Sequence, residues 1–277
     1  MPRYESPYDP AGSPKDLQYI VYEKKGHIAY VRINRPEVRN ALHSFAYVEL
    51  RRCWRDIGLD PEIYVGIVTG TGPAFCAGRD IKFLGQYQAE GKRTPHEDPN
   101  SPIYFWGGGG MPSDVNLEKP LIAALNGFAV GVGLSIALQC HLRVMAEDAW
   151  LGDQHTNVGR LGAPQDMYAA MPRAVAAHMT LCNGRLGAQD CLRFGMVNKV
   201  VPQDQVIAAA EQLAQMICDN SPLAVQAAVR LYRLASAYPA SLVSYQQHLD
   251  REIGESEDCQ EGVRAFREKR RPVWSLR

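Results

Sequence analysis

Apolar residues follow two different periods along the chain, and both predict regular elements. The segment LQYIVYEKKGHIAYVRINRP, residues 17–36, holds two β-rich runs around a Lys-Lys-Gly turn and predicts a hairpin. Residues 44–60 carry apolar side chains at helical spacing, with Ser44 at the position of the N-cap. The wholly apolar run YVGIVTG, residues 64–70, predicts a short strand that is buried on both faces.

Later segments change from short strands to helices. Strands are predicted at 120–125, 141–147, 150–154 and 198–201, with a helix that begins near Gly131. After Pro202, apolar spacing predicts four helices, at 203–219, 222–237, 240–254 and 257–269. Alternating strands and helices followed by an all-helical tail indicate a layered α/β core with a C-terminal helical extension.

This order of elements divides the chain into three parts. Residues 1–16 are rich in Pro, lack an apolar run and are expected to form a flexible lead-in and not a signal peptide. Residues 17–202 form the predicted α/β core, which contains a long irregular insert at 86–119. Residues 203–277 form the helical region.

Charge and cysteine usage narrow the function classes. Thirty basic and thirty acidic residues cancel, which disfavours nucleic-acid binding and is compatible with an oligomer. Seven scattered cysteines without a Cys-x-x-Cys pair suggest neither a disulfide framework nor a zinc site, so we expect a reducing, cytoplasmic location and no metal. Residues 121–140 have the length of a membrane span. Polar residues and glycines interrupt this run, which predicts a buried strand, a turn and a buried helix instead, with no membrane association.

Two glycine-rich turns are the best candidates for chemistry. AFCAGRDIK at 74–82 and NGFAVGVGLS at 126–135 each follow a buried strand and open into a helix. Such turns leave backbone N–H groups without intrahelical partners, and the helix dipole adds partial positive charge there. Two of them side by side would form a two-donor site for a developing oxyanion.

Five segments in this order resemble the enoyl-CoA hydratase/isomerase, or crotonase, superfamily. They are RINRPEVRNAL, IVTGTGPAFCAGRDIK, KPLIAALNGFAVGVGLSIALQCHLRVMAEDA, LRFGMVNKVVP and EGVRAFREKRRPVW, and the resemblance covers about residues 17–274. It implies an α/β spiral of β-β-α turns with a C-terminal helical region that builds homotrimers, often paired into hexamers. It also implies an acyl-CoA thioester substrate, with coenzyme A as part of the substrate and no permanently bound cofactor.

Carried over residue by residue, the resemblance assigns roles in the two turns. The oxyanion donors would be the backbone N–H groups of Arg79 and Val132. Lys82 matches a position near the adenine end of CoA, and Lys269 a position that can reach CoA from a neighbouring subunit. The full CoA-binding set would be Ala77, Gly78, Asp80, Ile81, Lys82, Gly131 and Lys269.

The chain lacks glutamates at three positions where members of the family carry them. Ser135, His155 and Ala163 stand where family members carry glutamates, and a serine hydroxyl without a paired base is a poor proton carrier. Imidazole suits acid–base work near neutral pH, so His155 is the candidate proton carrier. Asp153 would orient its ring if both lie on an extended strand.

Several alternatives remain open around these catalytic candidates, Ser135, Asp153, His155 and Asp166. Asp153 and His155 could instead form a purely structural hydrogen bond across a loop, and Asp166 could then act in place of the histidine. We expect a non-glutamate enoyl-CoA hydratase or isomerase, with decarboxylation, C–C cleavage or β-diketone hydrolysis as alternatives on the same fold. A non-catalytic acyl-CoA-binding protein is the alternative from another class. Tyr104, Phe105 and Trp106 either wall the acyl pocket, which would favour a bulky or cyclic acyl group, or pack under the loop.

Overall fold

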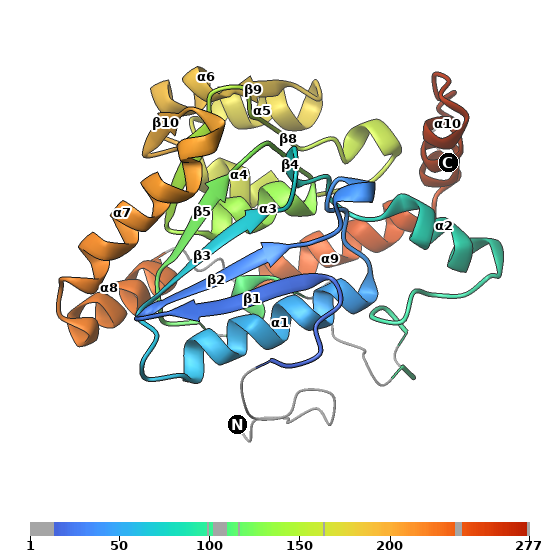
Figure 1. The fold of residues 1–277 in the computed structure, drawn as a ribbon. Helices are drawn as coiled ribbons and strands as arrows, with labels where there is room; N and C mark the ends of the chain where they lie inside the picture. Colours follow the sequence, from blue (N-terminus) through green and yellow to red (C-terminus); the bar gives the residue numbers. More distant parts are fainter. Residues whose placement is uncertain are drawn as a thin grey trace.

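Two β-sheets form the centre of the protein, whose computed structural model describes residues 14–98, 100–101, 110–115, 117–162, 164–235 and 240–275 (Figure 1). The larger sheet has the strand order β1-β2-β3-β5-β7-β10. Its strands are β1 (Ile20–Lys25), β2 (Ile28–Ile33), β3 (Val65–Gly70), β5 (Leu121–Leu125), β7 (Leu142–Ala146) and β10 (Lys199–Val201). β1 and β2 form the predicted antiparallel hairpin, and the remaining neighbours are parallel.

The core lies on both faces of this sheet. Every residue of β3 and β5 is buried, as their continuous apolar runs predict. Helix α7 (Val206–Cys218) packs along β3, β5 and β7, while α1 (Ser44–Leu59) packs on β1 and β2. A side chain at Gly66 of β3 would lie 3.1 Å from Ile57 of α1, so the two layers approach closely.

Helix α1 begins one residue away from the predicted cap. His43, not Ser44, is the N-cap, and its Nδ1 accepts a hydrogen bond from the Ala46 N–H at 3.2 Å. Ser44 is the first helical residue, and its hydroxyl lies 2.8 Å from Nδ1 of His96. The prediction failed because Ser44 is a strong N-cap residue by type, whereas an imidazole nitrogen supplies the acceptor here.

A smaller sheet positions the candidate site. It consists of β4 (Ala74–Cys76), β6 (Phe128–Val130), β8 (Trp150–Gly152) and β9 (Arg185–Gly187), in that order. Only β8 was predicted from the sequence. The other three strands have three residues each, which is too short for an alternating pattern to identify.

The helices follow the predicted order, with one change at the insert. The remaining α-helices are α2 (Ile81–Ala89), α3 (Val132–Gln139), α4 (Pro164–Ala170), α5 (Arg173–Leu181), α6 (Ala188–Arg193), α8 (Pro222–Ala235), α9 (Ala240–Glu255) and α10 (Glu257–Glu268). Short 3-10 helices are η1 (Pro36–Val38), η2 (Pro112–Val115), η3 (Thr156–Val158) and η4 (Gln203–Gln205). Because α2 continues to Ala89, the irregular insert begins after that residue and not at 86. Tyr104, Phe105, Trp106 and Ala163 lie outside the described residues.

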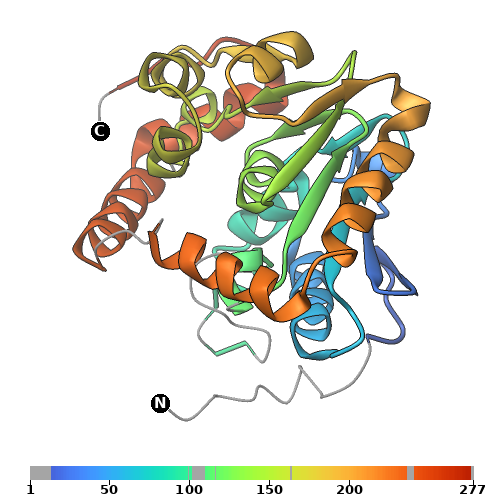
Figure 2. The same ribbon diagram turned by 90° about the vertical axis from the view of Figure 1, so that its left-hand side faces the viewer.

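Helix α10 of the C-terminal region packs against the chain's own core. Figure 1 shows α9 passing behind the sheets and α10 beside α2, and in Figure 2 α9 lies at the outer left edge of the molecule. A side chain at Gly85 of α2 would lie 3.1 Å from the guanidinium of Arg267 in α10. Helix α10 also packs on η3 through two glycines: a side chain at Gly262 would lie 2.8 Å from the Gly159 nitrogen. The helical tail therefore contacts the segment that follows β8.

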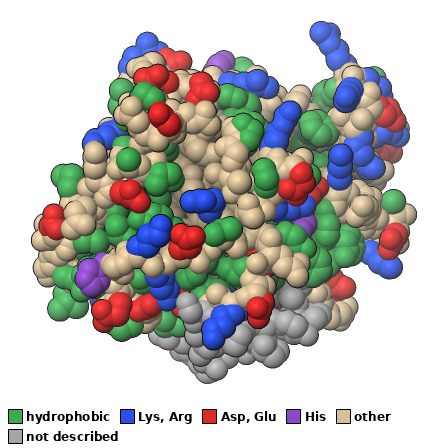
Figure 3. All heavy atoms as spheres, in the orientation of Figure 1, with side chains coloured by type: hydrophobic (Ala, Val, Ile, Leu, Met, Phe, Trp, Pro, Cys, Tyr) green, Lys and Arg blue, Asp and Glu red, His purple; other side chains and the backbone are tan. Residues whose placement is uncertain are grey.

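Two surface properties bear on the predictions. Acidic and basic side chains alternate over the face seen in Figure 3, with no broad basic patch on that side. Within the described part of the chain, no helix has the length and apolar character that crossing a bilayer requires. The apolar run at 121–140 instead contains β5, β6 and α3.

Candidate functional site

Parallel pairing of β4 and β6 brings the two glycine turns to one edge of the small sheet. A glycine with positive φ follows each strand: Gly78, at +88°, lies two residues after β4, and Gly131, at +54°, directly follows β6, a conformation that favours glycine. The turns lie in close contact, since a side chain at Gly78 would be 2.9 Å from the Val130 carbonyl oxygen. The same position lies 3.6 Å from the Val132 nitrogen.

Hydrogen bonding around these turns leaves two amides unused. Leu42 bridges the first turn: its N–H donates to the Gly78 carbonyl at 2.8 Å, and its carbonyl accepts from the Asp80 N–H at 2.8 Å. The intervening Arg79 N–H has no acceptor among the described residues. Val132 is the first residue of α3, and its N–H likewise has no acceptor in that part of the chain.

His155 and Asp153 lie directly beside the second turn. The Gly131 N–H donates to the Gly152 carbonyl at 3.1 Å, so the residues that follow β8 adjoin the start of α3. Nδ1 of His155 lies 2.6 Å from Oδ1 of Asp153. A side chain at Gly131 would lie 3.5 Å from Cε1 and 3.6 Å from Nε2 of His155, so this edge of the imidazole faces the turn.

We expected an extended strand to place Asp153 and His155 on one face, and this expectation was wrong. Strand β8 ends at Gly152, Gln154 adopts a left-handed φ of +63°, and His155 is helical before η3. A tight turn, and not an extended strand, therefore brings Asp153 and His155 together. An apolar pattern does not predict this turn, because the turn depends on the positive φ of Gln154, a conformation that residues other than glycine rarely adopt.

The Asp153–His155 pair is enclosed by backbone. Asp153 is buried at 3% exposure, and its second oxygen, Oδ2, has no hydrogen-bond partner in the described structure. A side chain at Gly162 would lie 2.5 Å from Nδ1 of His155 and 2.9 Å from Oδ1 of Asp153. With Nδ1–H donating to Asp153, Nε2 is left as the proton-accepting nitrogen on the side of Gly131.

The Arg79 side chain is held by a polar cluster that sequence reasoning missed. Its Nη2 forms an ion pair with Oε1 of Glu97 at 2.6 Å and lies 3.3 Å from the Thr94 hydroxyl. Burial opposes ionisation of Glu97, but Arg79 and a hydrogen bond from Thr94 lower its pKa to about 2. Burial and the charge of Arg79 lower the pKa of neighbouring His96 to about 4. The insert therefore fixes the guanidinium while the Arg79 amide stays free.

Other predicted acid–base residues occupy less favourable positions. The Ser135 hydroxyl donates to the Gly131 carbonyl at 3.3 Å, within its own helix. Asp166 is half-buried in the first turn of α4, and burial raises its pKa. Neither contact connects the residue to His155.

The predicted CoA-binding residues divide into structural and accessible groups. Asp80 caps α2 by accepting from the Phe83 N–H at 3.1 Å, and it pairs with Arg35 at 3.1 Å. Ala77 and Ile81 are half-buried beside the first turn. Lys82 and Lys269 are exposed, and Lys269 ends α10, the helix that stands beside α2 of the same chain.

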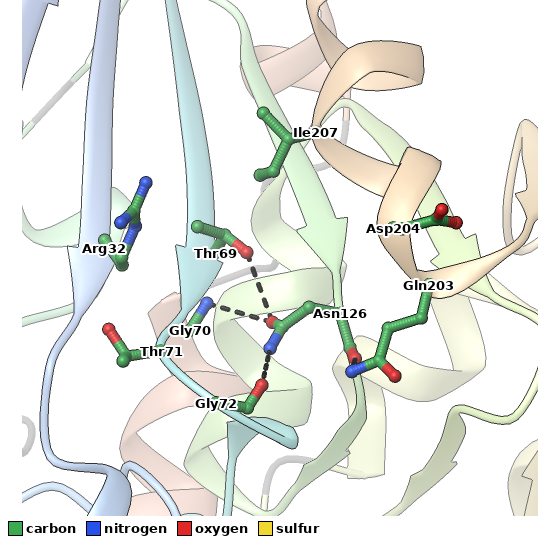
Figure 4. Close-up of a pocket in the computed structure, with 9 residues that line it drawn as sticks. All are labelled: Arg32, Thr69, Gly70, Thr71, Gly72, Asn126, Gln203, Asp204 and Ile207. Atoms are coloured by element: carbon green, nitrogen blue, oxygen red, sulfur yellow. Dashed lines mark hydrogen bonds between the residues drawn. The ribbon is translucent and has the colours of Figure 1, made fainter.

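A separate hollow of about 570 Å³ lies away from this site (Figure 4). Its lining residues are Arg32, Thr69, Gly70, Thr71, Gly72, Asn126, Gln203, Asp204 and Ile207. Asn126 accepts from the Gly70 N–H at 3.0 Å and donates to the Gly72 carbonyl at 2.8 Å, which ties the ends of β3 and β5 together. This hollow is open, and Arg79, Val132 and His155 are not among its lining residues. No group of three or more acidic, histidine or cysteine side chains in the described part of the chain could hold a metal ion.

Known proteins are similar to this chain over almost its whole length. The Enoyl-CoA hydratase/isomerase family model matches residues 23–277. An (E)-benzylidenesuccinyl-CoA hydratase of Thauera aromatica is 34% identical over 92% of this chain and 98% of its own. A mevalonyl-coenzyme A hydratase of Aspergillus fumigatus is 33% identical over 90% of this chain and 91% of its own. The crystal structure of a carnitinyl-CoA hydratase from Mycobacterium avium superimposes with a TM-score of 0.79 at 32% identity, covering 94% of this chain and all of that one. The α/β crotonase fold is thereby confirmed, and the chain belongs to the enoyl-CoA hydratase/isomerase family, whose members include CoA-thioester hydratases and dehydratases.

Proposed function

We propose that the chain hydrates a 2-enoyl-CoA thioester, or dehydrates the corresponding 3-hydroxyacyl thioester, through His155. The observation that carries this proposal is the Asp153–His155 hydrogen bond of 2.6 Å, placed beside the second of two turns with free amides. The relatives named as CoA hydratases favour addition of water over isomerisation or C–C cleavage. Their names also favour a substituted acyl chain over a short straight one.

In this mechanism the thioester oxygen accepts hydrogen bonds from the N–H groups of Arg79 and Val132. When water adds to the β-carbon, the C=C electrons move toward this oxygen, and the two amides stabilise the enolate. His155 transfers a proton between water and the α-carbon, while Asp153 fixes the ring and stabilises imidazolium. No glutamate is needed at the positions of Ser135 and His155.

The CoA portion would lie along the first turn and the start of α2. Backbone at Ala77, Gly78 and Ile81 would line the pantetheine, and the exposed ammonium of Lys82 would meet a phosphate. Lys269 would add a second cation, supplied by α10. We expect coenzyme A to bind only as part of the substrate or product.

Self-association forms the last part of this proposal. Helices α8 and α9 expose large apolar side chains, namely Leu223, Leu231, Tyr232, Leu234, Leu242 and Tyr245. Burying them against other copies of the chain would remove apolar area from water, and a net charge of zero adds little repulsion. The molar mass from light scattering should therefore correspond to a trimer or a hexamer, and a monomeric mass would contradict this part.

Turnover of a panel of 2-enoyl-CoA and 3-hydroxyacyl-CoA thioesters tests the proposal. His155→Ala should lower kcat by about 100-fold or more, the usual contribution of a general acid–base group. His248→Ala is the matched control, because His248 is exposed on α9 and its ion pair is with Glu252 of the same helix, at 3.5 Å. Full turnover by His155→Ala, or hydrolysis of a cyclic β-diketone without CoA, would contradict the proposal.

A further inference from the structure

A turn of the insert, residues 94–97, contacts both the first glycine turn and the start of α1. The Glu97 N–H closes this turn by donating to the Thr94 carbonyl at 2.8 Å. Thr94 and His96 are buried, at 1% and 2% exposure. Buried polar side chains need hydrogen-bond partners, and those of this turn find partners in the two neighbouring elements.

One side of the turn is attached to α1 through His96. Its Nδ1 lies 2.8 Å from the Ser44 hydroxyl, and its ring meets the Tyr47 ring edge-on with the centroids 5.0 Å apart. Ser44 and Tyr47 belong to the first turn of α1, and both are buried. His96 therefore joins the insert to the N-terminal end of this helix.

The other side is attached to the Arg79 side chain through Glu97. The carboxylate pairs with the guanidinium at 2.6 Å, and the Thr94 hydroxyl donates to the other carboxylate oxygen. Although burial opposes ionisation, the charge of Arg79 and these hydrogen bonds lower the pKa of Glu97 to about 2. The pair therefore stays charged at neutral pH, and charge-assisted hydrogen bonds are shorter and stronger than neutral ones.

Leu42 connects the start of α1 to the first glycine turn through the backbone. Its N–H donates to the Gly78 carbonyl at 2.8 Å, and it lies two residues before Ser44. In a planar trans peptide the carbonyl and the N–H point to opposite sides, so this bond directs the Arg79 N–H away from Leu42. The direction of the proposed oxyanion donor is therefore set by the position of residues 42–44 relative to Arg79.

Both attachments of residues 94–97 bear on this one peptide group. His96 holds Ser44, next but one to Leu42, and Glu97 holds the side chain of Arg79. A shift of the first glycine turn relative to α1 would rotate the peptide between residues 78 and 79. Such a shift would also break one of the two attachments, so the insert opposes it.

We propose that Glu97 is a positioning residue of the oxyanion hole: its ion pair with the Arg79 guanidinium keeps the Arg79 N–H directed at the thioester oxygen. This assignment rests on the proposed hydratase function. In this role Glu97 contacts neither the substrate nor the reacting atoms, and it transfers no proton. It acts through the length and angle of one hydrogen bond, and a displacement of about 1 Å at such a group can lower a rate by about 100-fold.

Glu97→Gln tests this role, because the amide keeps the shape of the side chain but loses the charge that holds the guanidinium. We expect kcat to fall by at least about 10-fold and KM to change by less than about threefold, since the oxyanion donor stabilises the transition state more than the bound substrate. Glu90→Gln is the matched control and should leave kcat unchanged. Glu90 lies on the same insert side of α2, is exposed and pairs with Lys92 at 2.9 Å.

A double-mutant cycle shows whether Glu97 acts through Arg79. Arg79→Met keeps the backbone amide and removes the guanidinium, so it should lower kcat about as much as Glu97→Gln does. The double variant should be no slower than either single variant, because both changes remove the same interaction. Effects that multiply in the double variant would overturn the inference.

The enolate of bound acetoacetyl-CoA separates positioning from simple charge neutralisation. This enolate has its own absorbance, and the oxyanion hole stabilises it. If Glu97 positions the Arg79 N–H, Glu97→Gln should raise the pH at which the enolate band appears. If Glu97 only offsets the charge of Arg79, the unpaired guanidinium should lower that pH, and the inference would be wrong. Arg79→Met supplies the same titration should Glu97→Gln fail to fold.

The outcomes distinguish this inference from the proposed function. Glu97→Gln with the kcat and enolate titration of the Glu90→Gln control, in a protein whose turnover depends on His155, would overturn the role of Glu97 alone. Failure of the wild-type protein to bind any acyl-CoA would overturn the proposed function and this inference together.

Discussion

Gly162 lies against the imidazole of His155 so closely that it leaves no room for a side chain. A methyl group built on its Cα would be 2.5 Å from Nδ1 of His155 and 2.9 Å from Oδ1 of Asp153. The hydrogen bond between these two side chains therefore depends on a glycine seven residues further along the chain.

Gly162→Ala should separate Asp153 from His155. Steric overlap of this kind typically costs about 1–3 kcal/mol, and the displaced imidazole should reduce kcat by at least about 10-fold. Gly187→Ala is the control, since nothing lies within 4 Å of a side chain there. Urea unfolding and turnover measure the two effects, and equal kcat values for both variants would contradict the prediction.

Asp153→Asn keeps the shape of the buried side chain and removes its charge. The amide cannot stabilise imidazolium and favours the wrong tautomer of His155, so we expect kcat to fall by about 10²–10⁴-fold. Asp190→Asn provides a comparison, because Asp190 pairs with Arg193 on the surface at 2.7 Å. If Asp153→Asn turned over substrate like Asp190→Asn, the pair would have only a structural role.

Val132→Pro removes a single N–H group at the proposed oxyanion hole. Proline is tolerated at the first residue of an α-helix, and Val132 is that residue in α3. Loss of one oxyanion donor should lower kcat by about 10²–10³-fold while circular dichroism shows an unchanged fold. Val132→Ala, which keeps the amide, should retain most activity. A fully active Val132→Pro variant would exclude this donor.

His96 makes the folded protein sensitive to acid. Unfolded histidine binds a proton near pH 6.5, whereas burial and Arg79 keep folded His96 neutral to about pH 4. Between these values the unfolded state holds more protons, so the free energy of unfolding should decrease as the pH falls. His96→Gln should weaken this dependence by about 1–3 kcal/mol over that range. Equilibrium unfolding at several pH values measures it, and parallel curves for both proteins would contradict the prediction.

The sequence predicted those parts of the fold that depend on long apolar runs. The hairpin, the buried strands β3, β5 and β7, and the four C-terminal helices lie where periodicity placed them. The three-residue strands β4, β6 and β9 were missed because pairing with β8 and with one another, and not a local pattern, makes them strands. Tertiary context decides such short elements.

Only those parts of the candidate site that lie close together in the sequence could be predicted from it. The glycine turns and the Asp153–His155 spacing are visible in the sequence. Glu97 and His96 lie in an irregular insert without periodicity, so no apolar pattern points to them. Helix α10 packs on η3, which follows His155, and its Arg267 approaches α2, which follows Arg79; no local pattern predicts such long-range contacts.

A crystal structure with bound acetoacetyl-CoA tests the central claim most directly. The account predicts that the thioester oxygen lies about 2.7–3.1 Å from both the Arg79 and Val132 nitrogens, as expected for an oxyanion hole. It also predicts Nε2 of His155 within hydrogen-bonding reach of the acyl group or of a water beside it. A thioester oxygen that contacts neither nitrogen would contradict it.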